Sequence, residues 1–480
     1  MDDVLIVGAG PTGLMLAVWL AANGVKARIV DPKPGPTSET RAVTVQARTL
    51  EFFAMLGIAE RAAERGRIAR ASNLWAGGKV VARIPLGEIG KGRSPYPFVL
   101  LLSQSETEAL LYERLRELGG EVEWGLGVET VERSEVTFNF TPEREKAMFR
   151  FIIGCDGASS VVRKAAGFGF PGGTYSGRFY VADVDAKGGL VPGEVNISFD
   201  RDRFFAFFPL KAENRYRMVG ILNPDLLDEG VTLDDVRPEI EEGMRTTVEN
   251  ANWFSLYRVH HRVVDRFRKG PIFLAGDAAH VHSPFGGQGM NTGLGDAVNL
   301  GWKLVEVLKY GASERLLDTY EVERLPFAKA LVATTDRAFE MVVRQTPFAR
   351  FVRTRLIPLV LPFVFRLGFA QRRAFGTVSQ TGIDYRKSPL SVGKSGRFVA
   401  GDRLPSSDGI QPAAGQWSLV MLENSAKALA WCDRHSILPT VGSGNEILLV
   451  RPDGHLGLVR EEFDADELDR YMREVVGRPK

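Results

Sequence analysis

The chain has 480 residues, with 61 Lys and Arg against 59 Asp and Glu, and 44% of its residues are hydrophobic. This composition excludes a disordered or collagen-like protein, and a net charge of +2 provides no electrostatic basis for nucleic-acid binding. Two cysteines, Cys155 and Cys432, cannot form a disulfide framework or a cysteine-rich metal site. The 51 glycines exceed the roughly 7% share that is usual in proteins, and many of them cluster in motifs.

No targeting or membrane segment is predicted. The N-terminus is acidic, and glycines break the apolar run that follows it, so a signal peptide is not expected. The most hydrophobic stretch, residues 356–369, is shorter than the roughly 20 apolar residues of a membrane span and contains Pro358, Pro362 and Arg366. We expect no integral membrane span and a cytoplasmic location, with surface contact of this stretch with a membrane as the alternative.

The start of the chain has the pattern strand, glycine turn, helix, strand. Residues 4–7 are a continuous apolar run, typical of a strand buried on both faces of a parallel sheet. A helix is predicted over residues 12–23, and a second strand over residues 27–30 ends at Asp31. This is the βαβ opening of a doubly wound α/β domain.

The turn between this strand and helix reads GAGPTG over residues 8–13. In such a motif the first glycine allows a tight turn, the second lets the backbone approach a pyrophosphate, and the third permits close packing of helix on strand. Asp31 stands where a carboxylate would bind the ribose of a dinucleotide. A structural turn without a ligand is the alternative, but the strand, helix and acid around the motif favour a dinucleotide.

Two further glycine-flanked acids follow at predicted strand ends. The first is GCDGASSVVR over residues 154–163, and the second is LAGDAAH over residues 274–280, which PFGGQGMN at residues 284–291 follows at the head of a long helix. Glycines let the main chain lie against a flat ring, and a helix N-terminus favours negative charge on it. A reduced flavin is such a ring, so these motifs favour FAD over NAD as the bound dinucleotide.

With these three motifs in this order and spacing, the sequence resembles the FAD-dependent aromatic hydroxylases of the p-hydroxybenzoate hydroxylase fold, the class A flavoprotein monooxygenases. The segments YRKSPL at 385–390, GDRLP at 401–405 and RPDG at 451–454 are most similar to phenol and polyketide hydroxylases with a C-terminal thioredoxin-like domain. The resemblance implies an α/β protein with these parts: a Rossmann-like FAD-binding domain (1–175 and 271–340), an inserted β-rich substrate domain (176–270, with 73–96 as a candidate addition), a helical bridge (341–383) and a thioredoxin-like α/β module (384–480).

The resemblance also implies which residues bind the cofactor. Asp31 would bind the adenosine ribose, although the family more often has Glu there, and Asp156 would serve both FAD and NADPH. The remaining assignments are Gly8, Gly10, Thr12 and Gly13 at the pyrophosphate, Arg41 near it, Val128 at the adenine, Gln104 at the ribityl region, Asp277 at the ribitol, and Pro284, Gly287, Gln288, Gly289, Met290 and Asn291 along the isoalloxazine.

The implied function is hydroxylation of a phenolic or polycyclic, polyketide-like aromatic with NAD(P)H and O2, through a flavin C4a-hydroperoxide. FAD would be bound non-covalently, and NAD(P)H, with NADPH favoured, would bind only transiently because the sequence has no second dinucleotide motif. An antibiotic-inactivating monooxygenase is the alternative, and a non-catalytic flavin-fold binding protein is a third, disfavoured by the intact loop at residues 287–291. No catalytic base is assigned, and a homodimer is left open.

For several other features of the sequence, a structural role is a sufficient explanation. His280 and His282 lack the partners of a zinc site, so we expect structural hydrogen bonds and no metal. His260 and His261 would lie on opposite faces of a strand. The aromatic run at residues 204–208 either lines an aromatic pocket or supplies core residues, because strand side chains alternate. The C-terminal module has no C-x-x-C, which excludes thiol–disulfide exchange.

Overall fold

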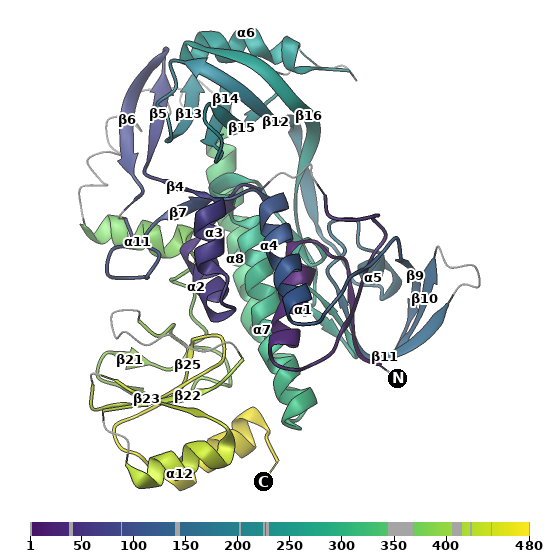
Figure 1. Cartoon of the computed structure of the whole chain (residues 1–480), viewed down its shortest axis with the longest axis vertical. Helices are drawn as coiled ribbons and strands as arrows, with labels where there is room; N and C mark the ends of the chain where they lie inside the picture. Colours follow the sequence, from purple (N-terminus) through teal and green to yellow (C-terminus); the bar gives the residue numbers. More distant parts are fainter. Residues whose placement is uncertain are drawn as a thin grey trace.

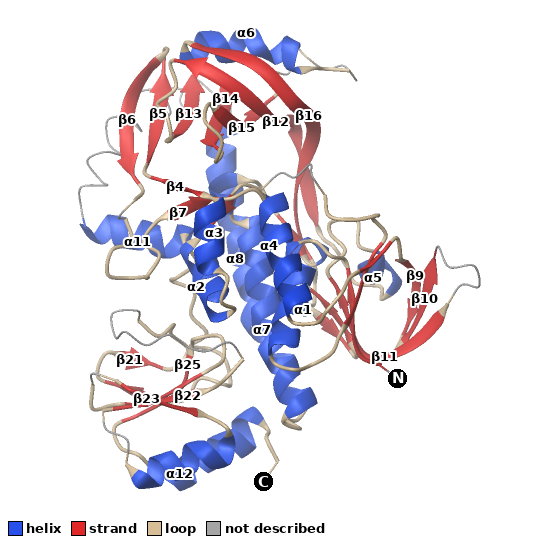
Figure 2. Ribbon diagram, viewed as in Figure 1, coloured by secondary structure: helices blue, strands red, loops and turns tan. Residues whose placement is uncertain are grey.

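The protein has a mixed α/β fold, which a computed structural model describes for residues 2–37, 42–87, 89–139, 145–200, 203–223, 226, 230–343, 368–405, 415–422, 425–442 and 444–479. Figures 1 and 2 show three parts: a sheet that contains β12 to β16 and is covered by α6, a central bundle of helices beside the sheet that contains β11, and a smaller α/β unit at the C-terminus. In the described part of the chain, no helix has the length and apolar composition that crossing a bilayer requires.

The first sheet is mainly parallel and has the order β17-β18-β11-β1-β2-β8, with β9 and β10 joined to it beside β11. Its central strand β1 pairs in parallel with β11 on one side and β2 on the other. Residues 4–7 of β1 are almost fully buried, as the continuous apolar run predicts. Its strands are β1 (Asp2–Val7), β2 (Arg28–Asp31), β8 (Glu123–Trp124), β9 (Gly127–Glu132), β10 (Glu135–Asn139), β11 (Lys146–Gly154), β17 (Arg268–Lys269) and β18 (Ile272–Leu274).

Helices α1 (Pro11–Ala22), α4 (Gln104–Glu117) and α7 (Gly289–Lys309) pack together over this sheet. The predicted first helix is confirmed: Pro11 opens it in the first turn, and Gly24 follows its end with a φ of +75°. Trp19 and Trp302 are fully buried in the same core. The other helices of this region are α2 (Ala47–Met55), α3 (Ala59–Arg65), α5 (Val161–Ala165) and α8 (Arg315–Val343), and a small sheet joins β3 (Thr44–Val45), β7 (Val99–Leu101) and β4 (Arg67–Ala69).

The second large sheet has the order β19-β16-β12-β15-β14-β13-β5-β6. The predicted alternating strands are confirmed here, and α6 (Leu233–Met244) covers the outer face (Figure 2). Phe205 and Phe207 pack under α6 in this core, so that pair of the aromatic run is structural. The strands are β5 (Ala71–Ala76), β6 (Lys79–Pro85), β12 (Gly172–Gly188), β13 (Val195–Asp200), β14 (Arg203–Pro209), β15 (Arg215–Ile221), β16 (Thr246–Val263) and β19 (His280–Val281).

The C-terminal unit is built on a four-stranded sheet of order β23-β22-β24-β25. Strands β22 and β23 are parallel and are connected through α12, whereas β24 and β25 form an antiparallel hairpin. Trp417 and Trp431 anchor its core against the helices, fully buried. The elements are β20 (Lys394–Ser395), β21 (Phe398–Val399), β22 (Ser418–Met421), α12 (Ala426–His435), β23 (Leu438–Val441), β24 (Ile447–Val450), β25 (Leu456–Arg460) and α13 (Ala465–Arg470). Helix α11 (Gly368–Val378) precedes this unit and lies beside α2 (Figure 1).

Candidate functional site

The glycine turn after β1 contains two glycines that the fold itself requires. A Cβ on Gly8, whose φ is +103°, would lie 2.5 Å from the carbonyl oxygen of Cys155, and a Cβ on Gly13 would lie 1.9 Å from the carbonyl oxygen of Gly8. Gly10 differs, because a Cβ there would meet no atom within 4 Å. No side chain caps the N-terminus of α1 at Gly10. The turn therefore presents open space and free N–H groups, which is what a pyrophosphate needs.

Asp31 lies beside this turn at the end of β2. Its Oδ2 accepts a hydrogen bond of 2.7 Å from the Ala9 N–H, and its Oδ1 accepts one of 2.9 Å from the Lys33 N–H. The carboxylate is buried and its orientation is fixed by these two bonds. Since each carboxylate oxygen has two acceptor positions, Asp31 retains capacity for ribose hydroxyls.

The second motif connects to the third through one arginine. Asp156 caps α5: its Oδ1 accepts from the Ser160 hydroxyl at 2.5 Å, and its Oδ2 accepts from the Val161 N–H at 2.7 Å. Arg163, which is buried, donates to the carbonyl oxygens of Ala158 in the second motif (2.6 Å) and Ala278 in the third (2.9 Å). The side chain of Asp156 thus serves the local fold, and its contact with cofactors stays a prediction.

The first and third motifs meet at Thr12. A Cβ on Gly276 or Gly293 would lie 2.5 Å or 2.3 Å from the Thr12 hydroxyl oxygen, so only glycine allows this packing. Gly276 also has a φ of +60° and begins the short turn that carries Asp277, whose side chain is exposed. Two motifs that are more than 250 residues apart in sequence therefore pack against each other at Thr12.

Behind this surface, His280 belongs to a buried ion network. Its Nε2 lies 2.7 Å from Asp296 Oδ2, while Arg324 Nε donates to Asp296 Oδ1 at 2.6 Å. Burial opposes the charge on Asp296, but Arg324 and His280 together lower the pKa of its carboxyl. The Gly276 N–H donates to the same carboxylate at 3.1 Å, which ties the network to the third motif. The expected structural hydrogen bond of His280 is confirmed, and no group of three metal-ligating side chains occurs among the described residues.

Within the described part of the chain, one ring nitrogen of His282 has no hydrogen-bond partner. Its Nδ1 lies 2.7 Å from the Ser283 carbonyl oxygen, which assigns the proton to Nδ1 and leaves Nε2 as an acceptor. Burial, followed by the nearby His280, lowers the pKa of His282 to about 4, so the ring is neutral at pH 7. The buried Nε2 makes no hydrogen bond within the described structure and faces Gly289 at the start of α7.

The loop before α7 is held by side chains that it was expected to offer to the flavin. Asn291 Nδ2 donates to the carbonyl oxygens of Thr44 (2.9 Å) and Gly287 (2.8 Å), and its Oδ1 accepts from Gln46 N–H at 2.9 Å. Gly286 and Gly287 have φ values of +75° and +62°. What the loop leaves for a flat ligand is its glycine backbone and the N–H groups of the first turn of α7, which no side chain caps.

The other predicted cofactor residues are distributed around these motifs. Gln104 begins α4, with its N–H bonded to Ala42 O at 2.9 Å and its Nε2 donating to Glu108 at 2.9 Å. Val128 is buried in β9, where it pairs with Phe138. Pro284 and Met290 flank the glycine loop at the head of α7. Arg41 lies outside the described residues.

Sequence reasoning missed Arg217, which connects the second large sheet to the segment before β3. On the inner face of the second sheet, Arg217 is 1% exposed and forms two bonds with Asp183, at 2.8 and 2.9 Å. Its Nη1 also donates to Ala42 O at 2.9 Å. Ala42 lies two residues before Thr44, whose carbonyl oxygen is bonded by Asn291 at the head of α7. No local sequence pattern marks such an arginine, because both its partners are distant in the chain.

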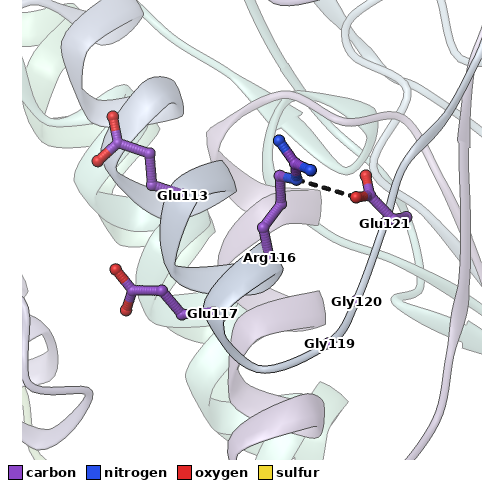
Figure 3. A pocket seen from close by; sticks show the side chains of 6 residues that line it. All are labelled: Glu113, Arg116, Glu117, Gly119, Gly120 and Glu121. Atoms are coloured by element: carbon purple, nitrogen blue, oxygen red, sulfur yellow. Dashed lines mark hydrogen bonds and ion pairs between the residues drawn. The ribbon is translucent and has the colours of Figure 1, made fainter.

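A surface hollow occurs at the far end of α4 and does not involve these motifs. It is lined by Glu113, Arg116, Glu117, Gly119, Gly120 and Glu121 (Figure 3). The Arg116–Glu121 ion pair across it measures 2.9 Å, and both side chains are about 60% exposed. Such exposed pairs contribute little energy, and none of the glycine motifs lines the hollow, so we assign it no chemistry.

The fold and the three joined motifs define a dinucleotide-binding flavoprotein, and comparison with known proteins places it more closely. A family model described as "FAD binding domain" matches residues 1–335, so the chain belongs to that family. A flavin-dependent monooxygenase of Mycobacteroides abscessus is 34% identical, covering 95% of this chain and 97% of the relative. A rifampicin monooxygenase of Streptomyces venezuelae is 34% identical over 75% of each chain.

A solved structure of an anhydrotetracycline hydroxylase from Streptomyces rimosus superposes on this fold with a TM-score of 0.79. It is 28% identical, and the match covers 100% of this chain and 99% of that one. The protein is therefore an FAD-dependent monooxygenase of the aromatic hydroxylase type, for which NAD(P)H is the typical co-substrate.

Proposed function

We propose that the protein hydroxylates a polycyclic, phenolic aromatic of polyketide type, using FAD, NADPH and O2. The observation that carries the proposal is the meeting of Thr12, Gly276 and Gly293, because it packs the glycine turn of the first motif against the Gly276–Ala278 turn and the first turns of α7. The rifampicin and anhydrotetracycline enzymes among its relatives support a large, oxygenated ring system as substrate.

Two features of the surface fit FAD in particular. The space in front of Gly10 would take the pyrophosphate, and Asp31 would bind the ribose. At the other end, Gln46 Oε1 and His282 Nε2 are buried acceptors with no hydrogen-bond partner within the described residues. Buried acceptors require donors, and the N–H and O–H groups of a flavin or a phenol would provide them. When bound, FAD supplies hydride acceptance and oxygen activation, while the protein orients the rings and excludes water.

We infer the following role for each domain. Residues 1–175 and 271–340 hold FAD, the β-rich region 176–270 together with β5 and β6 covers the substrate, and residues 384–480 form a thioredoxin-like module without redox chemistry. Residues 344–367 of the predicted bridge at 341–383 lie outside the described residues. Support comes from the sheet topology, in which β5 pairs directly with β13. Non-covalent FAD, a cytoplasmic location and a homodimer stay predictions.

The protein's own residues shape the reaction space from two sides. On the flavin side, the uncapped first turn of α7 directs N–H groups toward the ring that accepts hydride, which favours negative charge there. On the substrate side, Arg217 joins the inner face of the second sheet to Ala42. Phe204 and Phe208 lie on that inner face, opposite to the buried pair under α6. They are the candidates for contact with an aromatic ring.

Anaerobic reduction of the flavin by NADPH tests this proposal. With a polycyclic phenol that the enzyme hydroxylates, we expect flavin reduction to accelerate at least about tenfold. A ligand that binds more tightly to the conformation in which NADPH reduces the flavin shifts the enzyme toward that conformation. Stopped-flow absorbance measures the rate with and without ligand. A panel that includes rifampicin and a tetracycline-type phenol distinguishes biosynthetic from antibiotic-inactivating substrates. Equal rates with and without a proven substrate would contradict the expected acceleration.

Asp277→Ala is expected to lose FAD without losing the fold. The exposed carboxylate of Asp277 stands at the turn where the third motif meets Thr12, so its removal leaves no buried cavity and deletes the proposed acceptor for the ribitol. One such bond is worth about 1–3 kcal/mol, which weakens binding by about one to two decades. Flavin titration of the apoprotein measures the dissociation constant, and the thermal midpoint should stay near that of wild type. A fully flavinated variant would contradict the assignment.

A further inference from the structure

The turn after α11 reaches into the head of α7. Gln380 in this turn has a φ of +60° and is 4% exposed. Its Nε2 donates two hydrogen bonds, one to Gln288 Oε1 at 2.8 Å and one to Thr292 Oγ1 at 2.9 Å. Gln288 in return donates to the carbonyl oxygen of Val378, at the end of α11, at 2.7 Å. A segment about 90 positions downstream is thereby bonded to both sides of the first turn of α7.

The residues that Gln380 holds are those that set the geometry of the glycine loop. Gln288 is the N-cap of α7, and its Nε2 also bonds the carbonyl oxygen of Gly286 at 3.2 Å. Thr292 closes the turn by donating to Gln288 O at 2.9 Å. Because Gly286 and Gly287 can adopt many backbone conformations, the bonds through Gln288 restrict the loop. Gln380 therefore acts on the flavin surface through its neighbours, without forming part of it.

The conformation of Gln380 argues that its side chain is needed. A positive φ favours glycine or asparagine, and a longer side chain at such a position is disfavoured unless its surroundings compensate. The surroundings of Gln380 compensate: both N–H groups of its amide are used, and the Arg48 N–H of α2 donates to the Ser379 carbonyl oxygen in the same turn at 3.1 Å. Glycine would build the same turn more easily but would leave Gln288 Oε1 and Thr292 Oγ1 without this donor.

We propose that Gln380 is a positioning residue for the flavin: it fixes Gln288 so that the free N–H groups at the start of α7 face the isoalloxazine edge on which negative charge develops. Through this turn, the C-terminal part of the chain completes the redox site. The inference rests on the proposed function, since it takes α7 as the helix that faces the flavin. Oriented N–H groups stabilise an anion at a helix N-terminus, so loosening them should make the bound flavin harder to reduce.

Two variants of Gln380 test the proposal, together with a control variant at the C-terminal end of α11. Gln380→Gly keeps the backbone conformation and removes the side chain, whereas Gln380→Glu keeps the size and replaces the donor by an oxygen that faces Gln288 Oε1. The control is Thr377→Ala, which removes a hydroxyl bonded only within α11, to Arg373 O at 3.1 Å. Gln380→Asn, compatible with the positive φ but too short to reach, replaces Gln380→Glu if that variant does not fold.

The readouts are the midpoint potential of bound FAD and hydrogen exchange of residues 288–293 in the apoprotein. For both Gln380 variants we expect the oxidised-to-reduced equilibrium to shift about tenfold toward oxidised flavin, which is about 30 mV for a two-electron couple, and the exchange at the head of α7 to rise at least about tenfold. The Thr377→Ala control should match wild type in both.

Wild-type potentials and exchange rates in both Gln380 variants would overturn the proposal. A shift that Thr377→Ala shares would also overturn it, because it would indicate a general loosening of α11. If the wild-type protein bound no FAD, the proposed function would fail on its own, and the exchange experiment on the apoprotein would still decide whether Gln380 orders the turn.

Discussion

Gly10→Ala is expected to abolish FAD binding and leave the apoprotein folded. The three glycines of the first motif have different surroundings, and the difference is the basis of the prediction. A Cβ on Gly8 or Gly13 would collide with backbone, at 2.5 Å and 1.9 Å, so those glycines are required before any cofactor arrives. A Cβ on Gly10 meets nothing within 4 Å, so the space that it would fill belongs to the ligand.

The expected loss for Gly10→Ala is at least about a hundredfold in the dissociation constant of FAD, because an added methyl group keeps the pyrophosphate from the N–H groups of α1. Titration of apoprotein with FAD measures the loss, and thermal unfolding of the apoprotein should be unchanged. Gly13→Ala is the matched variant: it should reduce the stability of the apoprotein itself. If Gly10→Ala bound FAD normally, the pyrophosphate would not lie at this turn.

Arg451→Met is expected to destabilise the protein by about 3–5 kcal/mol, the range for removing one partner of a buried ion pair. Arg451 is fully buried, and its two terminal nitrogens donate to Glu323 at 2.8 and 2.9 Å and to Asp453 at 2.7 Å. Glu323 lies on α8 and is also bonded by Lys303 of α7 at 2.8 Å, so the cluster joins the C-terminal unit to the flavin helices. The variant leaves two buried carboxylates short of a cation.

The control is Arg386→Met in the same C-terminal unit. Arg386 forms a two-bond ion pair with Asp402, but its side chain is 55% exposed, and exposed pairs are worth about 0–1 kcal/mol. Urea unfolding measures the free energy of both variants. Equal, small losses in the two variants would show that the buried cluster contributes no more than a surface pair.

The same cluster predicts an acid dependence. Burial opposes the charge on Glu323, but Arg451 and Lys303 outweigh it and lower the pKa of Glu323 from 4.5 to about 2. A folded-state pKa below the unfolded value stabilises the fold above about pH 4.5, and this stabilisation is lost as the pH falls toward 2. The stability difference between wild type and Arg451→Met should therefore narrow over that range.

Much of the fold could be predicted because its signals are local. The apolar run at residues 4–7, the glycine-capped first helix and the acid after β2 depend on neighbours in sequence, and the structure confirms these elements. The resemblance assigned the first and third motifs to the same cofactor, and the structure packs Gly276 of the third motif against Thr12 of the first. The split of the aromatic run was predictable only as alternatives, since a strand pattern does not reveal which face α6 covers.

What could not be predicted depends on contacts between distant segments. The position of Asn291 along the isoalloxazine stays a prediction, whereas the bonds of its amide to residues near position 45 had no sequence signal, because only the folded chain brings that segment to α7. Arg217 and Gln380 have no motif around them, and their partners lie 34 to 175 positions away. The left-handed conformation of Gln380 also has no sequence signal, because glycine and asparagine are the residues that usually mark it.

Incorporation of ¹⁸O from ¹⁸O2 into a polycyclic phenol tests the central claim most directly. The reconstituted holoenzyme is incubated with NADPH, ¹⁸O2 and the aromatic that most accelerates flavin reduction. Mass spectrometry then measures the mass of the product. The account predicts one ¹⁸O atom per product molecule, with one NADPH consumed for each, and no product from Gly10→Ala. NADPH oxidation that yields only hydrogen peroxide across phenols, rifamycins and tetracyclines, or product oxygen derived from water, would contradict it.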